Sequence, residues 1–169
     1  MKKYLSLVLF AHSVFALPFA FIGFFLALHT TDFVFSWKLL LLMPVCMVTA
    51  RNAAMAFNRY LDRDIDAINP RTAMRDIPAG KISAKNALAF TIANCLIFVA
   101  ATYFINSLCF MLSPIALFVV LFYSYTKRIT PLCHLVLGTG LGLAPIGAYL
   151  VITGQFAIVP VLYGFAVLT

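Results

Sequence analysis

Three polar residues recur at every fourth position next to a long apolar segment. Asn58, Asp62 and Asp66 have the spacing i, i+4 and i+8, and each step of four residues turns an α-helix by about 40°, so the three side chains share one face. Asp64 lies about 240° from Asn58 and points elsewhere. Carboxylates stacked in this way repel each other unless a cation lies between them. Several hard oxygen ligands suit Mg²⁺, which keeps waters and often bridges to substrate phosphates.

Basic side chains surround this motif. The stretch from Phe57 to Lys81 holds four of the five acidic residues of the chain, the last being Asp76. The cationic residues in or near it are Arg59, Arg63, Arg71, Arg75, Lys127 and Arg128. These side chains suit an anionic diphosphate that is held between a metal ion and basic residues. The alternative is a solvated, salt-bridged loop that only fixes membrane topology, which explains the arginines better than the periodic acids.

Arg51 is an isolated charge inside an apolar run. It precedes Asn58 by seven residues, so it lies two helical turns deeper and only about 20° off the same face. Ionisable residues inside a membrane are costly and usually face a cavity. We interpret Arg51 as the cation of a pocket below the metal site that receives the carboxylate or phenolic oxygen of a second substrate. The alternative is a guanidinium that snorkels to the interface.

The elements that must position these residues are membrane helices. The chain of 169 residues is 64% hydrophobic and 10% charged, with a mean hydropathy of +1.04, whereas soluble domains are about half apolar and about a quarter charged. A helix crosses a bilayer with about 20 mostly apolar residues, and runs of this length exceed barrel strands. The predicted fold is therefore an all-α transmembrane bundle. Its predicted spans are residues 4–28, 38–60, 86–105, 108–126 and 132–152, with a sixth beginning near Phe156.

Basic residues alternate between successive connections. Lys2 and Lys3 precede the first span, the connection 61–85 is rich in Arg and Lys, and Lys127 and Arg128 follow the fourth span. The connections 29–37, 106–107 and 153–155 contain no Lys or Arg. Basic loops stay cytoplasmic, so we expect a cytoplasmic N-terminus and cytoplasmic active-site loops in a plasma membrane, the inner membrane of a bacterium. The net charge is +7, but the basic residues lie between apolar spans, so the charge gives no reason to expect nucleic acid as a partner.

The sixth apolar segment is too short to cross a bilayer. It has 14 residues from Phe156 to Thr169, and a terminal carboxylate in hydrocarbon is costly. We expect residues 1–169 to be the N-terminal part of one longer transmembrane domain, interrupted in span six. A re-entrant hairpin is the alternative.

The motif Asn58-RYL-Asp62-RDI-Asp66 resembles the first aspartate-rich motif, NxxxDxxxD, of the UbiA-type membrane prenyltransferases. The wider string RNAAMAFNRYLDRDIDAINPRTAMRDIPAG is similar to the 4-hydroxybenzoate polyprenyltransferase branch of that family. So are HSVFALPFAFIGFFLA in the first span and YSYTKRITPLCHLVLG leading into the fifth. The resemblance covers nearly the whole chain.

The resemblance implies nine membrane helices around a cavity that opens to lipid for an isoprenoid tail. Two aspartate-rich motifs then hold Mg²⁺ against a prenyl diphosphate, with Asn58, Asp62 and Asp66 as the first motif and the two aspartates as catalytic residues. The resemblance also implies that Lys127 and Arg128 help to cap the diphosphate. No second DxxxD follows Asp76, so we expect residues 1–169 alone to be inactive.

The implied reaction is Mg²⁺-assisted electrophilic aromatic substitution. A polyprenyl group moves from its diphosphate to an aromatic acid such as 4-hydroxybenzoate, in ubiquinone or menaquinone biosynthesis. The residues expected to bind the substrates are Arg51, Asn58, Arg59, Arg63, Arg71, Arg75, Lys127 and Arg128.

Two alternatives from other classes stay open. A CDP-alcohol phosphotransferase requires DG and AR pairs ahead of GxxxDxxxD, whereas Asn58 occupies the place of that glycine and no DG precedes it. A membrane transporter or scaffold requires the acidic residues to be only topological, and a transporter more often has broken helices with polar groups at the midplane.

Overall fold

The computed structural model describes residues 10–129 and 133–168 of the chain, and the regular structure in these ranges is helical. The helices are α2 (Phe10–Thr30), α3 (Trp37–Ile68), α4 (Ala84–Tyr103), α5 (Ser107–Ile129), α6 (Cys133–Thr153) and α7 (Ile158–Leu168). Each of the six predicted apolar segments corresponds to one helix, which confirms the all-α prediction. Lys2, Lys3 and the start of the first predicted span lie outside the described residues.

Four helices are long and apolar enough to cross a membrane. They are α3, α4, the Ser107–Thr126 part of α5 and the His134–Thr153 part of α6. Two further apolar segments are Leu17–Thr30, which is part of the 21-residue helix α2, and Ile158–Val167 in α7. A helical membrane bundle is thus confirmed, and the short α7 agrees with the prediction that the sixth span is incomplete in this sequence.

Helix α3 continues eight residues beyond its predicted end at residue 60 and stops at Ile68. The predicted connection 61–85 was wrong at its start, because the segment after Tyr60 contains no helix breaker before Asn69-Pro70. A residue that precedes proline avoids the helical region, and Asn69 is extended, with its N–H bonded to the carbonyl of Ile65. The whole periodic motif therefore lies on one continuous helix.

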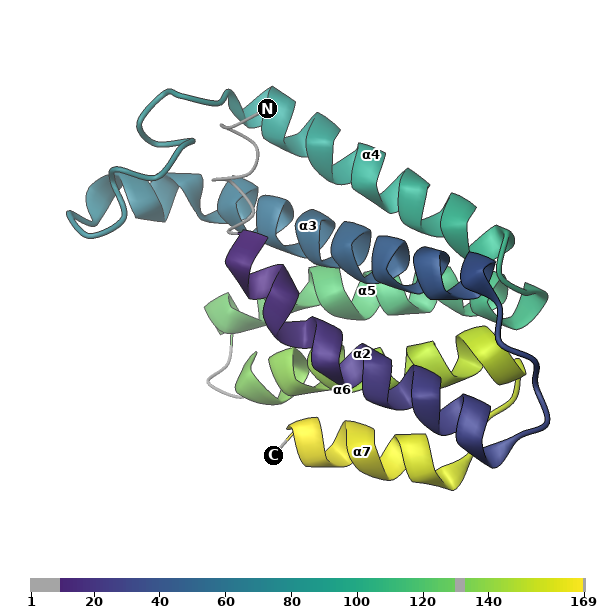
Figure 1. Cartoon of the computed structure of the whole chain (residues 1–169). Helices are drawn as coiled ribbons and strands as arrows, with labels where there is room; N and C mark the ends of the chain where they lie inside the picture. Colours follow the sequence, from purple (N-terminus) through teal and green to yellow (C-terminus); the bar gives the residue numbers. More distant parts are fainter. Residues whose placement is uncertain (1–9, 130–132, 169) are drawn as a thin grey trace.

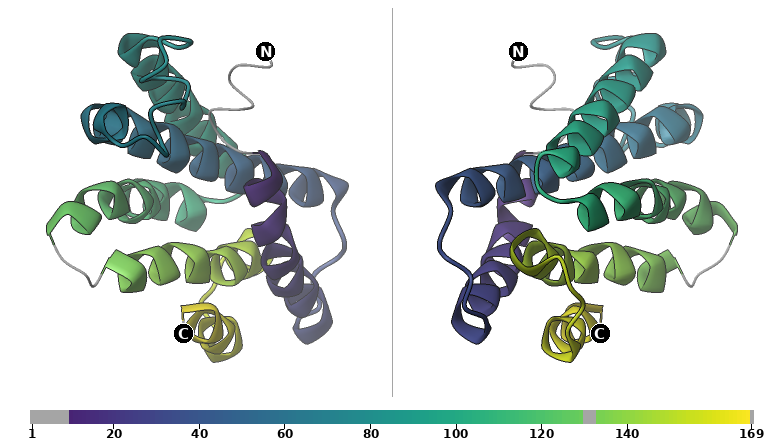
Figure 2. Two further views of the ribbon diagram at one scale, coloured as in Figure 1. Left: turned by 90° about the vertical axis from the view of Figure 1, so that its left-hand side faces the viewer. Right: turned by 90° about the vertical axis from the view of Figure 1, so that its right-hand side faces the viewer.

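The helices are arranged as a stack in which α3 packs between α4 and α5, and α6 packs between α5 and α7, with α2 across α3 and α6 (Figures 1 and 2). The connection 69–83 follows the C-terminal end of α3. It lies at the same end of the bundle as the C-terminus of α5 and the N-terminus of α6 (Figure 1). The connections 31–36, 104–106 and 154–157 lie at the opposite end. This alternation agrees with the predicted alternation between connections that contain Lys or Arg and connections that do not.

Close backbone contacts hold the helices around α6 together. A Cβ atom at Gly23 of α2 would collide with the carbonyl of Pro145 in α6, and Cβ atoms at Gly142 and Gly164 would collide across the α6–α7 contact. Small residues allow such close approach of membrane helices. The cavity described below lies between α3, α5 and α6.

Candidate active site

A cavity of about 570 Å³ runs along α3 between α5 and α6. The cavity wall contributed by α3 follows helical spacing: Met43, Cys46, Met47, Ala50, Arg51, Ala54, Met55, Asn58 and Arg59. From Met43 to Asn58 this wall spans about 22 Å at 1.5 Å per residue. The far part is apolar, with Leu150, Val151 and Phe156 among its lining residues. The cavity thus has a long apolar part, a cationic end lined by Arg59 and Arg75, and Arg51 about midway along the α3 wall.

The aspartates of the motif divide between two faces of α3, as the helical spacing predicts. Asp62 and Asp66 are buried, with 6% and 5% of their surface exposed. The side chain of Asp64 is 79% exposed. We call the face of Asn58, Asp62 and Asp66 the inner face of α3 and the face of Arg63 and Asp64 the outer face. The prediction that Asp64 points away from the motif is confirmed.

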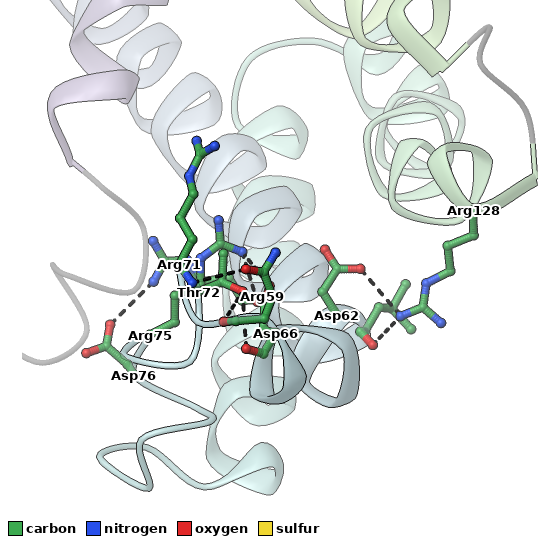
Figure 3. A network of polar contacts seen from close by, with 10 residues as sticks. Arg59, Asp62, Asp66, Arg71, Thr72, Arg75, Asp76 and Arg128 are labelled. Atoms are coloured by element: carbon green, nitrogen blue, oxygen red, sulfur yellow. Dashed lines mark hydrogen bonds and ion pairs between the residues drawn. The ribbon is translucent and has the colours of Figure 1, made fainter.

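Each inner-face aspartate contacts an arginine from another segment (Figure 3). Nη1 of Arg75, in the connection 69–83, donates to both carboxylate oxygens of Asp66 at 2.9 and 2.8 Å. Nη2 of Arg128, at the end of α5, lies 3.4 Å from Oδ1 of Asp62 and also donates to the carbonyl of Leu61. These ion pairs bring the basic residues predicted on two separate connections to the end of α3.

Two other predicted residues, Arg63 and Arg71, do not line the cavity. Arg63 lies over the ring of Tyr60, with 4.9 Å from Cζ to the ring centroid, and forms an ion pair of 3.6 Å with Asp64 on the outer face. Arg71 is exposed and does not line the cavity. The side chain of Lys127 lies outside the described part of the structure. Substrate-binding roles for Arg63, Arg71 and Lys127 stay predictions.

Arg51 lines the cavity two turns below Asn58, as predicted. Its Nε atom is buried and has no hydrogen-bond partner among the described residues. A buried donor without a partner costs about 1–3 kcal/mol. An anion in the cavity would remove this cost, so the position is suited to an anionic group of a ligand.

Asp76 is a site residue that the sequence did not single out. It is buried, with 8% of its surface exposed, and its carboxylate lies 3.4 Å from Nη1 of Arg59, a cavity-lining residue. Asp76 is outside the four-residue repeat, so periodicity could not identify it. The available signal was an acidic residue directly after Arg75 in a basic stretch.

The inner face offers oxygen ligands that suit Mg²⁺, one amide and two carboxylates. Within residues 10–129 and 133–168, no group of three His, Cys, Asp or Glu side chains is close enough to hold a metal ion. Mg²⁺ seldom needs such a cage, because it binds through one or two carboxylates together with substrate phosphates and water. A carboxylate has about four positions that can accept a hydrogen bond or bind a metal. Arg75 occupies only some of those of Asp66. The inner face therefore fits Mg²⁺ as part of a site completed by an anionic substrate.

Comparison with known proteins identifies the family. The model of the UbiA prenyltransferase family matches residues 16–169. A 4-hydroxybenzoate octaprenyltransferase from Tolumonas auensis is 33% identical over 73% of this chain and 43% of its own length. A protoheme IX farnesyltransferase from Acidiphilium cryptum is also 33% identical, over 70% of this chain and 38% of its own length. The chain thus spans less than half the length of these curated relatives.

Solved structures share the fold. The apo structure of a UbiA homologue from Aeropyrum pernix K1 aligns with a TM-score of 0.82 and 35% identity over 94% of this chain and 59% of its own. A UbiA homologue from Archaeoglobus fulgidus, solved with GPP and Mg²⁺, aligns with a TM-score of 0.76 and 21% identity over 98% of this chain and 60% of its own. The family model, the relatives and the fold agree, and the chain belongs to the UbiA prenyltransferase family.

Proposed function

We propose that the protein transfers a polyprenyl group from a prenyl diphosphate to an aromatic acid of the 4-hydroxybenzoate type, as a step of quinone biosynthesis at the cytoplasmic side of the plasma membrane. The observation that carries this proposal is the cavity, which joins a long apolar part to one end lined by Arg59 and Arg75, with Arg51 between this end and the apolar part. The apolar part suits an isoprenoid tail, and the end lined by arginine suits a diphosphate. A homologue of the same fold binds GPP and Mg²⁺, which supports the pairing of these two ligands.

The arginines at the cationic end are assigned to the diphosphate. Arg59 and Arg75 line the cavity, and Arg128 lies at the same end on Asp62. Planar guanidinium groups bind phosphate oxygens in pairs. Asn58, Asp62 and Asp66 would hold Mg²⁺, which when bound supplies positive charge beside the leaving group. Donors fixed in this way stabilise the charge that develops on the departing diphosphate.

Arg51 is assigned to the acceptor. It lies about 10 Å from Asn58 along the helix, at 1.5 Å per residue, so it can hold the acid group of an aromatic ring placed below the diphosphate. The bond between prenyl C1 and the diphosphate oxygen breaks, and the electron pair leaves with the diphosphate. The ring carbon ortho to the hydroxyl attacks C1, and the loss of its proton restores the aromatic ring. The apolar wall excludes water that would quench the allylic cation.

The test is prenyl transfer by membranes that contain the complete gene product. The membranes are given geranyl diphosphate or a longer prenyl diphosphate, labelled in the prenyl group, and 4-hydroxybenzoate, with Mg²⁺ or with EDTA. We expect a labelled prenylated acid that requires Mg²⁺. A product that forms equally in EDTA, or an absence of transfer to any aromatic acid, would contradict the proposal.

Haem is the second candidate acceptor, because a relative with the name protoheme IX farnesyltransferase is as similar to this chain as the octaprenyltransferase. The cavity offers Arg51 to an acid group, and both acceptors carry carboxylates. A competition assay with farnesyl diphosphate, 4-hydroxybenzoate and haem separates the two. If the prenyl group is transferred to haem alone, haem is the acceptor instead of the aromatic acid, and the assignment of the diphosphate site is unchanged.

A further inference from the structure

The connection 69–83 is an ordered cap on the end of α3. Thr72 Oγ1 donates to the carbonyl of Asp66 at 3.1 Å, and the Asp76 carbonyl accepts from the N–H of Ile82 at 3.0 Å. Ile82 is buried against Ala56 of α3 and Ala87 of α4. These contacts fix the backbone on both sides of Arg75 and Asp76, so the two side chains have defined places at the cavity.

Asp76 forms a nearly buried ion pair with Arg59. The two side chains are 11% and 13% exposed, and Nη1 of Arg59 lies 3.4 Å from Oδ2 of Asp76 (Figure 3). Removing one partner of a buried pair leaves an uncompensated charge, which is strongly destabilising. The pair therefore fixes the direction of the Arg59 side chain more firmly than an exposed ion pair would.

Two ion pairs of this region contain an arginine that lines the cavity. Arg59 and Arg75 line the cavity, whereas their partners Asp76 and Asp66 do not. Asp76 uses only part of the hydrogen-bonding capacity of Arg59, since a guanidinium has five N–H donors. Two like charges on one cavity wall repel each other at low dielectric, and a dianionic ligand would relieve that repulsion.

We propose that Asp76 is a positioning residue, whose carboxylate holds the Arg59 guanidinium at the cavity wall so that Arg59 and Arg75 bind one diphosphate together. The inference rests on the proposed function, since it requires a diphosphate at this end of the cavity. Asp76 touches neither substrate nor reacting atoms. It acts through Arg59, and the loss of its charge should therefore matter only while Arg59 is present.

The test is a double-mutant cycle on the purified complete gene product, with inorganic pyrophosphate and Mg²⁺ as the probe in a calorimetric titration. We expect Asp76→Asn and Arg59→Gln each to weaken pyrophosphate binding about tenfold, the size of one charged hydrogen bond. In the Arg59→Gln protein, Asp76→Asn should add less than about twofold, because coupled sites are not additive. Asp64→Asn, which removes an acid on the outer face, should leave the affinity for pyrophosphate unchanged. None of these variants should change the affinity for the aromatic acid.

A full additional tenfold loss from Asp76→Asn in the Arg59→Gln protein, or wild-type affinity in Asp76→Asn, would overturn the inference. Should Asp76→Asn not fold, the exchange Arg59→Asp with Asp76→Arg keeps an ion pair but places a carboxylate in the cavity. It should restore folding without pyrophosphate binding, and binding at wild-type affinity would overturn the inference. A wild-type protein that binds neither pyrophosphate nor a prenyl diphosphate would instead refute the proposed function itself.

Discussion

The inner and outer faces of the last two turns of α3 carry the same kinds of residue in different surroundings. On the outer face, Asp64 pairs with its sequence neighbour Arg63 and is mostly exposed. On the inner face, Asp62 and Asp66 are buried and pair with Arg128 and Arg75, which come from other segments. Burial lowers the effective dielectric and strengthens electrostatic interactions. The position of a carboxylate around the helix, rather than its presence in an acidic stretch, therefore determines whether it can take part in a binding site.

The largest expected effect breaks the inner face. Asp62→Ala or Asp66→Ala in the complete gene product should lower prenyl transfer by at least about 10³-fold, because each removes a buried carboxylate expected to hold Mg²⁺. Asp64→Ala is the matched control, and an exposed ion pair contributes at most about 1 kcal/mol. Initial rates in membranes with equal protein content measure both. If Asp64 proves as essential as Asp62 while Asp66 is dispensable, the division into faces is wrong.

The next effect concerns Arg51, on the same face but deeper. Arg51→Leu should raise KM for the aromatic acid by roughly 10- to 100-fold, since hydrogen bonds to charged groups contribute about 1.5–3 kcal/mol. The KM for the prenyl diphosphate should change little. Two titrations in one membrane preparation measure the pair of constants, and Arg63→Leu on the outer face serves as the control. A loss confined to the diphosphate titration would move Arg51 into the diphosphate site.

A smaller effect is expected on diphosphate binding when Arg75 at the cavity and Arg63 on the outer face are compared. Arg75→Gln should weaken the binding of a prenyl diphosphate by about tenfold, one charged hydrogen bond, because Arg75 lines the cavity. Arg63→Gln should change the dissociation constant by less than about twofold, as expected for a partner in an exposed ion pair. Equilibrium binding of the labelled diphosphate measures both. Equal losses in the two variants would show that general positive charge, and not the cavity position, governs binding.

The smallest effect is on stability. Asp64→Asn should change the free energy of unfolding by less than about 1 kcal/mol, because its ion pair is exposed and links sequence neighbours. Asp76→Asn breaks a nearly buried pair and should cost several times more. Thermal unfolding midpoints in detergent rank the two. An Asp64 variant that unfolds at the lower temperature would reverse the comparison.

Helical spacing predicted the faces correctly, because the period of an α-helix is fixed whatever surrounds it. The sequence thus placed Asn58, Asp62 and Asp66 together, Asp64 apart and Arg51 below them. The end of α3 was not predicted, since hydropathy falls after Tyr60 while the helix continues to the first breaker at Asn69-Pro70. Hydropathy reports the extent of the apolar run and not the extent of the helix.

The partners of the inner-face residues could not be predicted either. Arg75 and Arg128 reach Asp66 and Asp62 only through tertiary packing of the connection 69–83 and of α5. The sequence offered a set of basic residues, Arg63 and Arg71 among them, without a means to rank them. Asp76 was missed for the same reason, because its partnership with Arg59 depends on the fold of the cap.

We propose that the inner face of α3 binds a metal and a prenyl diphosphate as one unit. The most direct measurement is the binding of unreactive geranyl thiodiphosphate to the purified complete gene product, titrated with and without Mg²⁺. We expect tight binding that requires Mg²⁺, is lost in Asp62→Asn and Asp66→Asn, and is retained in Asp64→Asn. Binding of equal affinity without Mg²⁺, or binding retained by both inner-face variants, would contradict it.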